Sequence, residues 1–140
     1  MENKSKIIKG GVDVDDRGSV AFVNDFCFDK VKRFYQVENH SLNFIRAWHG
    51  HRKEGKYFYV AKGAAMIGAA NLETDEVERF ILTSRTPSIL WIPPNYANGS
   101  MNLEEGTIIQ VFSTATLEES LNDDIRIRWD KWNIWDIEYR

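Results

Sequence analysis

The amino-acid sequence predicts an all-β fold, built as a sandwich or a closed barrel. Eight short segments are rich in Val, Ile, Phe, Tyr and Trp, the residues that favour β-strands. Residues that favour turns interrupt the chain between these segments at short intervals. Long helices do not alternate with the strands, so a parallel sheet is not expected. At 140 residues the chain has the common size of a single domain, and we expect one domain over residues 1–140.

The expected strands follow one another along most of the chain. They are Ser19–Asn24, Val31–Val37, Phe44–His49, Tyr57–Ala61, Ala64–Ala69, Val77–Leu82, Ser88–Ile92 and Thr107–Ser113. The main breaks between them fall at Asp15–Gly18, Glu54–Gly55, Lys62–Gly63, Pro93–Asn95 and Glu104–Gly106. One helical turn is expected at Leu117–Asn122, because Thr116 can cap its first turn. Beyond it, Asp124–Arg140 predicts a half-buried strand and then an aromatic tail that packs on the β-domain.

Charge and composition exclude several classes of protein. The net charge is −3 and the Lys and Arg residues are spread along the chain, so we expect no binding of nucleic acid. No apolar run approaches the roughly 18 residues that a membrane-spanning helix needs. The N-terminal lysines are not followed by the apolar run of a signal peptide, so we expect a cytoplasmic protein. Cys27, the single cysteine, cannot form an internal disulfide and is expected to be a small buried side chain.

A cluster of ionisable residues is the most informative chemical feature. In a strand, His49 and His51 project from the same face. A hairpin turn around Glu54–Gly55 would return the chain so that Lys56 faces the two histidines. Three ionisable groups would then converge on one pocket. The alternative is that the histidines are a surface feature or a hydrogen-bonded pair in a polar barrel mouth.

The spacing of these residues resembles the first motif of the cupin superfamily, a histidine pair followed by a glutamate and then a glycine. His49 and His51 match the pair, whereas Lys56 stands where that pattern has its metal-binding glutamate. The second cupin motif is matched by Pro93–Asn98, with Asn98 in place of its histidine. The resemblance implies an RmlC-like jelly roll. Because an ammonium group beside two histidines repels a cation, we expect no metal and no other cofactor.

Within the cupins, the chain is similar to the dTDP-4-dehydrorhamnose 3,5-epimerases, which are also called dTDP-4-keto-6-deoxyglucose 3,5-epimerases. It is also similar to the related dTDP-sugar 3,4-ketoisomerases, the WxcM-like proteins. The matching segments are Asp16–Gly18, Glu38–Ser41, Arg46–His49, Lys56–Gly63, Ile92–Gly99 and Asp124–Trp129. The resemblance implies a homodimeric isomerase of nucleotide-linked 4-keto-6-deoxy sugars. Such an enzyme would serve deoxysugar or cell-surface polysaccharide biosynthesis, including lipopolysaccharide.

The ionisable cluster fits this chemistry. Removing a proton from the carbon beside a ketone develops negative charge on the carbonyl oxygen, so the site needs a base and a positive group. The resemblance places His49 in the position of the catalytic base and Lys56 in that of the active-site lysine. His51 is then either a second acid or base or a hydrogen-bonding neighbour of the substrate.

Five further residues are candidates for binding the substrate. Arg17 and Arg46 suit the nucleotide diphosphate, because a planar guanidinium binds phosphate with two hydrogen bonds. Arg17 is equally well explained as a surface charge. Tyr35 can stack on the base or the sugar, although most aromatic residues of a small β-domain belong to its core. Asn39 and Asn98 lie in segments that match the family motifs.

The resemblance does not distinguish the two reactions. Val111 stands where the 3,5-epimerases have a proton-returning tyrosine, and His51 matches the paired histidines of the ketoisomerases. The strand that begins at Lys56 favours the epimerases instead. The acidic partner of the catalytic histidine in the epimerases has two candidates here, Asp136 and Glu138, of which we favour Asp136. A sugar-binding cupin without catalytic activity is an alternative of another class.

Overall fold

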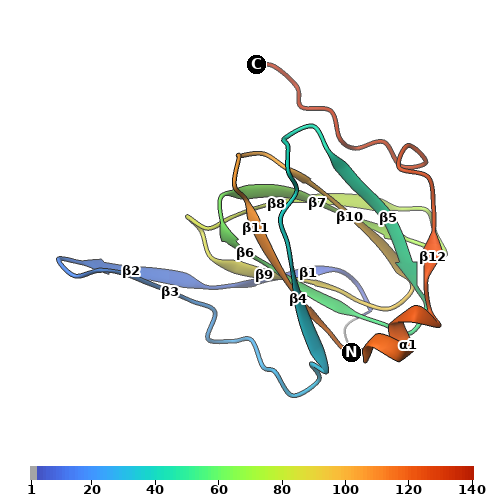
Figure 1. The fold of residues 1–140 in the computed structure, drawn as a ribbon, viewed down its shortest axis with the longest axis horizontal. Coiled ribbons are helices and arrows are strands. Elements are labelled where there is room, and N and C mark those ends of the chain that lie inside the picture. The colour runs from blue at the N-terminus through green and yellow to red at the C-terminus, as the bar shows by residue number, and fades with distance from the viewer. Residues whose placement is uncertain (1–2) are drawn as a thin grey trace.

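The computed structural model describes residues 3–140, and most of its regular structure is antiparallel β-strand (Figure 1). The first two residues of the predicted 1–140 domain lie outside the described residues. One five-stranded sheet contains, in spatial order, β1 (Lys6–Lys9), β9 (Ser88–Ile92), β6 (Lys56–Lys62), β11 (Ile108–Ser113) and β4 (Arg33–Val37). The second five-stranded sheet contains β12 (Ile125–Arg126), β5 (Ile45–His51), β10 (Tyr96–Asn102), β7 (Ala64–Asn71) and β8 (Val77–Thr83). The predicted sandwich is confirmed.

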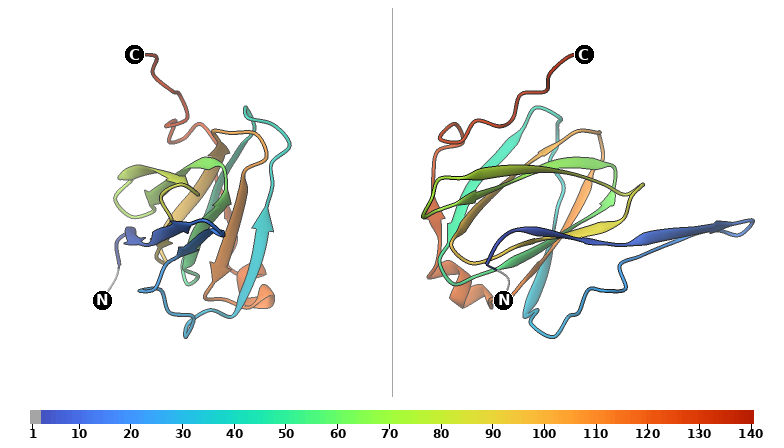
Figure 2. Two further views of the ribbon diagram at one scale, coloured as in Figure 1. Left: turned by 90° about the vertical axis from the view of Figure 1, so that its left-hand side faces the viewer. Right: turned by 180° about the vertical axis from the view of Figure 1, so that it is seen from behind.

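A separate two-stranded hairpin, β2 (Gly11–Asp15) and β3 (Gly18–Phe22), extends away from the sandwich (Figures 1 and 2). Its strands pair in regular antiparallel register, and the turn at its tip contains Arg17. The hairpin pairs with neither five-stranded sheet. Four of the five residues in each of its strands are exposed.

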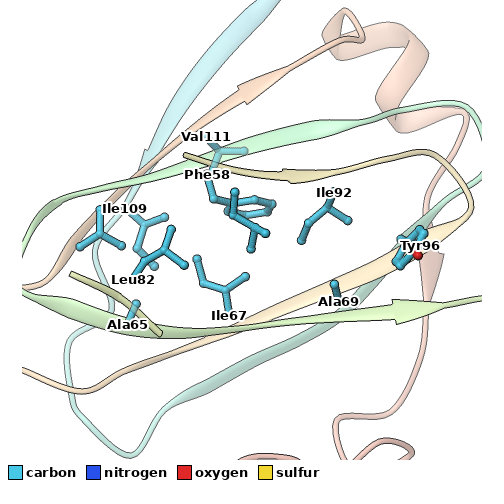
Figure 3. Close-up of a cluster of buried hydrophobic side chains, with 11 residues drawn as sticks. Phe58, Ala65, Ile67, Ala69, Leu82, Ile92, Tyr96, Ile109 and Val111 are labelled. Carbon is cyan, nitrogen blue, oxygen red and sulfur yellow. The ribbon is translucent and has the colours of Figure 1, made fainter. Parts of the chain in front are cut away.

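The main core lies between the two sheets (Figure 3). Alternate residues of a strand point to the same face of a sheet, so Phe58 and Val60 of β6 face inward together. From the opposite sheet, Ile67 of β7 enters the same cluster. The complete set of buried side chains is Phe58, Val60, Ala65, Ile67, Ala69, Leu82, Leu90, Ile92, Tyr96, Ile109 and Val111.

A second apolar cluster covers the outer face of the sheet that contains β5, β7 and β10. Trp48 of β5 is 1% exposed, and its ring centroid lies 5.3 Å from that of Trp132 and 5.2 Å from that of Trp135. Its indole N–H donates to the carbonyl oxygen of Trp129, at 2.9 Å. The glycine at position 68 leaves room for the Trp48 ring, which would lie 2.5 Å from an added Cβ. The prediction that the C-terminal tail packs on the sandwich is confirmed.

The only helix in residues 3–140 is α1 (Leu117–Leu121), which the capping pattern predicted to within one residue. The Thr116 hydroxyl accepts from the backbone N–H of Glu119, at 3.2 Å. The Glu119 carboxylate accepts in return from the backbone N–H of Thr116, at 2.9 Å. With five residues, this helix is too short to cross a membrane, and the described residues form no other helix that could do so.

The structure corrects several expectations about local structure. Strands β1, β2 and β10 were not predicted. Strand β10 has Asn, Gly and Ser at its centre and is buried at every position, so it lacks the polar alternation that marks a strand. The strand expected after Asp124 is limited to Ile125–Arg126. Cys27 is exposed rather than buried, because it lies in a segment outside both sheets.

Replacing the Trp48 side chain tests the role of the outer cluster. Trp48→Ala should lower the free energy of unfolding by about 3–5 kcal/mol, the usual cost of removing a buried aromatic side chain. Tyr139→Ala is the matched control, because Tyr139 is 98% exposed and its loss should change stability by less than about 0.5 kcal/mol. Denaturant unfolding followed by far-ultraviolet circular dichroism measures both. Equal stability of the two variants would contradict the packing described here.

Candidate active site

A cavity of about 330 Å³ lies between the two sheets beside α1. Strands β4, β5, β6, β10 and β11 contribute its walls, and α1 and β12 border it. A volume of this size is typical of small-molecule sites. Its floor is apolar and includes Phe58 and Val111, which also belong to the main core.

The cavity brings together six of the eight predicted site residues. They come from four strands and are Tyr35, Arg46, His49, His51, Lys56 and Asn98. The seventh, Asn39, is buried beside the cavity without lining it. The Nε–H of Arg46 donates to Oδ1 of Asn39, at 3.1 Å, so Asn39 contacts an arginine that lines the cavity.

Arg17 is the eighth, and it does not line this cavity. It lies in the turn at the tip of the projecting hairpin, where its side chain is 87% exposed and forms an ion pair with Asp15. The hairpin extends away from the sandwich (Figure 1), and Arg17 is not among the residues of the same chain that line the cavity.

The C-terminal acids, Asp136 and Glu138, do not line the cavity beside His49. Asp136 and Glu138 are exposed and follow Trp135, which packs on the outer face of the second sheet. The backbone carbonyl of Asp136 accepts from Arg79, at 3.0 Å, on that same side. The tail thus runs over the face opposite the cavity. The carboxylate that lines the cavity beside His49 is Asp124.

A register shift in β5 determines which residues face the cavity. Asn98 of β10 pairs with His49 and the next residue of β10 pairs with Ala47, so Trp48 has no partner on β10. Its backbone instead exchanges two hydrogen bonds with Ile127, at 3.0 and 3.1 Å. An extra residue reverses the alternation of side chains. Arg46 therefore faces the cavity together with His49, although the two are an odd number of residues apart.

His51 is held at one of its ring nitrogens. Its Nδ1 lies 2.6 Å from the backbone carbonyl of Asp123 and 3.3 Å from Oε1 of Glu54. A carbonyl oxygen only accepts, so Nδ1 carries a proton and donates it. The Nε2 atom is buried and has no hydrogen-bond partner in the described part of the chain. In the neutral ring, Nε2 therefore carries no proton, and its lone pair accepts no hydrogen bond.

The pKa values of both histidines are lowered. Burial, together with the positive charges of Arg126 and Lys56, lowers the pKa of His49 to about 4, and Asp124 opposes this only in part. Burial and the charge of Lys56 also lower the pKa of His51, against the opposing effects of Asp123 and Glu54. Both imidazoles are consequently neutral at pH 7 and able to accept a proton.

The cavity carries an excess of positive charge. Arg33, Arg46, Lys56 and Arg126 line it, against the single carboxylate of Asp124. Lys56 is only 7% exposed, and its ammonium lies 5.6 Å from the centroid of the Tyr35 ring. Arginines in such a setting favour a phosphorylated or otherwise anionic ligand. Sequence reasoning missed Arg33, which lies in none of the matching segments, and Arg126, although it lies in the matching segment Asp124–Trp129.

The residues present do not fit a cupin metal site. Residues 3–140 contain no cluster of three or more His, Cys, Asp or Glu side chains that could hold a metal ion. The Lys56 ammonium faces the histidines, and the side-chain N–H of Asn98 donates to the backbone carbonyl of His49, at 3.3 Å. This donor set would repel a divalent cation instead of coordinating it.

Three comparisons relate the chain to known proteins. The model of the FdtA family, described as WxcM-like, C-terminal, matches residues 3–127. Comparison with curated proteins gives no match. One similar solved structure is that of QdtA, a sugar 3,4-ketoisomerase from Thermoanaerobacterium thermosaccharolyticum in complex with TDP. Its TM-score is 0.74 at 23% identity, over 93% of this chain and 92% of that chain.

Two epimerases have similar structures. The dTDP-4-dehydrorhamnose 3,5-epimerase from Bacillus anthracis, with TDP and PPi bound, has a TM-score of 0.78 at 18% identity, over 90% of this chain and 79% of that chain. The corresponding enzyme from Sulfolobus tokodaii has a TM-score of 0.77 at 23% identity, over 94% of this chain and 82% of that chain. At these identities the likeness establishes a shared fold.

The electrostatics of the cavity predict how His49 titrates. In the free protein its imidazole should titrate near pH 4, well below the ordinary value of 6.5. Arg126→Gln should move the midpoint upward, because it removes a positive charge that opposes protonation. Nuclear magnetic resonance of the imidazole nitrogens measures both midpoints. A midpoint at or above 6.5 in the unaltered protein would contradict the burial and charge described for this residue.

Proposed function

Because the chain belongs to the FdtA family, described as WxcM-like, C-terminal, we propose that it isomerises a dTDP-linked 4-keto-6-deoxy sugar by metal-independent proton transfer beside the ketone. The observation that carries this proposal is the convergence of His49, His51 and Lys56 in one cationic cavity. A neutral imidazole can remove a proton, and a nearby ammonium can stabilise the negative charge that develops on the ketone oxygen.

Among the reactions of this class, 3,4-ketoisomerisation is the one we favour. A base removes the proton from C3, the electrons of that bond form the C3–C4 double bond of an enediol, and O4 gains a proton. The enediol then loses the proton of O3 and gains one at C4, so the carbonyl moves from C4 to C3 without net change in atoms. Two acid–base groups on one face suit this transfer. Val111, an apolar residue of the cavity floor, offers no acid for epimerisation.

We assign the roles of the ionisable residues as follows. His49 removes the proton from the carbon beside the ketone, and His51 is the second acid–base group. Lys56 stabilises the oxyanion. A base with a pKa of about 4 is weak, but an anionic diphosphate bound by Arg46 and Arg126 offsets the charges that lower it. Binding of the substrate thus brings the pKa of His49 closer to neutrality, where a general base works best.

The remaining candidates bind the nucleotide sugar in this proposal. Arg33 contacts the diphosphate together with Arg46 and Arg126, and Asn39 supports Arg46 through its hydrogen bond. Tyr35 stacks on the sugar or the base, next to the Lys56 ammonium. The alternative of a binding cupin without activity does not account for two neutral imidazoles beside an ammonium group.

We also propose that the protein is a homodimer. The hairpin exposes Val12, Val14 and Val20, which are 42%, 75% and 66% exposed, and a two-stranded hairpin alone is at best marginally stable. Phe28 and Phe34 are 61% and 66% exposed and form a further apolar surface. A second copy would cover such surfaces. Light scattering at micromolar concentration that gave the mass of one chain would refute this assembly.

The setting of the reaction follows from the substrate. A nucleotide-linked sugar carries a charged diphosphate that does not cross membranes unaided, so we place the enzyme in the cytoplasm with the enzymes that make its substrate. The product would enter deoxysugar or cell-surface polysaccharide biosynthesis, including that of lipopolysaccharide. No membrane or nucleic-acid partner is required.

Solvent exchange tests the proposed reaction. Incubation with dTDP-4-keto-6-deoxyglucose in deuterated water should give a 3-keto product that contains deuterium, detected by mass spectrometry and proton resonance spectra. His49→Asn should abolish the exchange, because it removes the base, and should leave affinity for dTDP within a few fold. If the unaltered protein binds the sugar nucleotide without exchange, the binding-cupin alternative gains support. If His49→Asn exchanges normally, the base is His51.

Kinetic constants should separate Lys56 from Arg46. Lys56→Ala should lower kcat by about 100-fold or more, because the developing oxyanion loses its nearest positive charge. Arg46→Ala should mainly raise KM, because its contact with the diphosphate is the same in the ground and transition states. Steady-state kinetics with the same substrate measures both constants. The assignment is wrong if the two substitutions have the same pattern of effects.

A further inference from the structure

Glu54 occupies an unusual position for a glutamate in a turn. It lies between β5 and β6, where a charged side chain is ordinarily solvated. Its side chain instead points inward and is 1% exposed. The Ser113 hydroxyl donates to one carboxylate oxygen, and the Ser120 hydroxyl donates to the other, at 2.8 Å. The turn pattern in the sequence gives no sign of this burial.

The carboxylate of Glu54 meets one basic side chain. Its Oε1 lies 3.3 Å from Nδ1 of His51, and no other ion pair of Glu54 occurs among residues 3–140. Two hydroxyl groups are neutral donors, so they leave the negative charge uncompensated. A buried carboxylate without a cationic partner is costly. The charge is compensated when His51 takes up a proton at Nε2 and becomes an imidazolium.

Asp123 fixes the geometry of this pair. Its carboxylate accepts the backbone N–H groups of Arg52, Lys53 and Glu54, at 2.8, 2.8 and 3.0 Å, and so anchors the turn. Its backbone carbonyl accepts the Nδ1 proton of His51. One residue thus sets both the position of Glu54 and the tautomer of His51. Nε2 is left as the basic nitrogen of the ring.

We propose that Glu54 is a positioning residue for His51. The Glu54 carboxylate orients the imidazole of His51 and compensates the positive charge that this imidazole acquires during proton transfer. This inference rests on the proposed function, in which His51 is the second acid–base group. Glu54 itself does not line the cavity. The charged and titratable groups near His51 that bear on its ionisation are Lys56, Glu54, Asp123, Asp124 and His49.

A purely structural role for Glu54 makes a different prediction. Ser113 belongs to β11 and Ser120 to α1, so the carboxylate also joins two elements of the fold. If that were its only role, Glu54→Gln would lower stability without changing the ionisation of His51. Glutamine has nearly the same shape and keeps one acceptor oxygen, but it lacks the charge. The substitution therefore separates the two roles.

The test combines kinetics with nuclear magnetic resonance of the imidazole nitrogens. In Glu54→Gln, kcat for dTDP-4-keto-6-deoxyglucose should fall about 10-fold to 100-fold with KM within about twofold. Without substrate, the midpoint of His51 titration should shift to lower pH, and Nδ1 should remain the protonated nitrogen. Glu105→Gln, at an exposed position, is the control and should change neither quantity. Both proteins are compared at a temperature at which each is fully folded.

The two readouts separate this inference from the proposed function. The titration needs no substrate, so it tests the contact between Glu54 and His51 even if the protein does not turn over the sugar nucleotide. An unchanged midpoint in folded Glu54→Gln, or an unchanged kcat in an active enzyme, would overturn the inference. If Glu54→Gln does not fold, Glu54→Asp keeps the charge at a greater distance. Glu54→Asp should then lower the midpoint of His51 titration by less than Glu54→Gln would. An unchanged midpoint in Glu54→Asp would refute the positioning role of Glu54.

Discussion

The two-residue alternation of the β-strand is the constraint on which the site depends. On β6, Lys56 shares its inward face with Phe58 and Val60, so one strand supplies both the cavity and the core. The ionisable end of this face lies beside α1, and the apolar end closes the sandwich. A shift of β6 by one residue would turn Lys56 away from the cavity and, at the same time, Phe58 and Val60 out of the core. The position of the cavity is therefore fixed by the same register that buries the core.

The sequence predicted those parts of the site that depend on regular alternation. His49, His51 and Lys56 were placed together by strand parity and a hairpin turn, and they do line one cavity. The contribution of Glu54 was not predictable, because turn glutamates are normally solvated and its burial depends on serines distant in the sequence. Asp136 was chosen by resemblance alone, and the path of the tail over the outer face could not be read from its alternating pattern.

The polar network beside the cavity opposes the stability of the fold. Lys56, His51 and Glu54 are each less than 9% exposed, and buried ionisable groups are unfavourable unless their partners are complete. The buried indoles of the outer cluster contribute stability at a place remote from the chemistry. In enzymes, active-site residues commonly lower the stability of the fold, and packing elsewhere in the molecule offsets this loss. Here one strand, β5, carries both contributions on its opposite faces.

The register shift at Trp48 connects the C-terminal tail to the lining of the cavity. The extra residue persists because its backbone is bonded to Ile127 and its ring is enclosed by Trp132 and Trp135. A shorter β5 that paired continuously with β10 would turn Arg46 toward the outer face of the sheet, away from the cavity. The tail thus helps to determine that Arg46, which we propose contacts the diphosphate, lines the cavity. A gap-free alignment of β5 with a regular strand would assign the arginine to the wrong face.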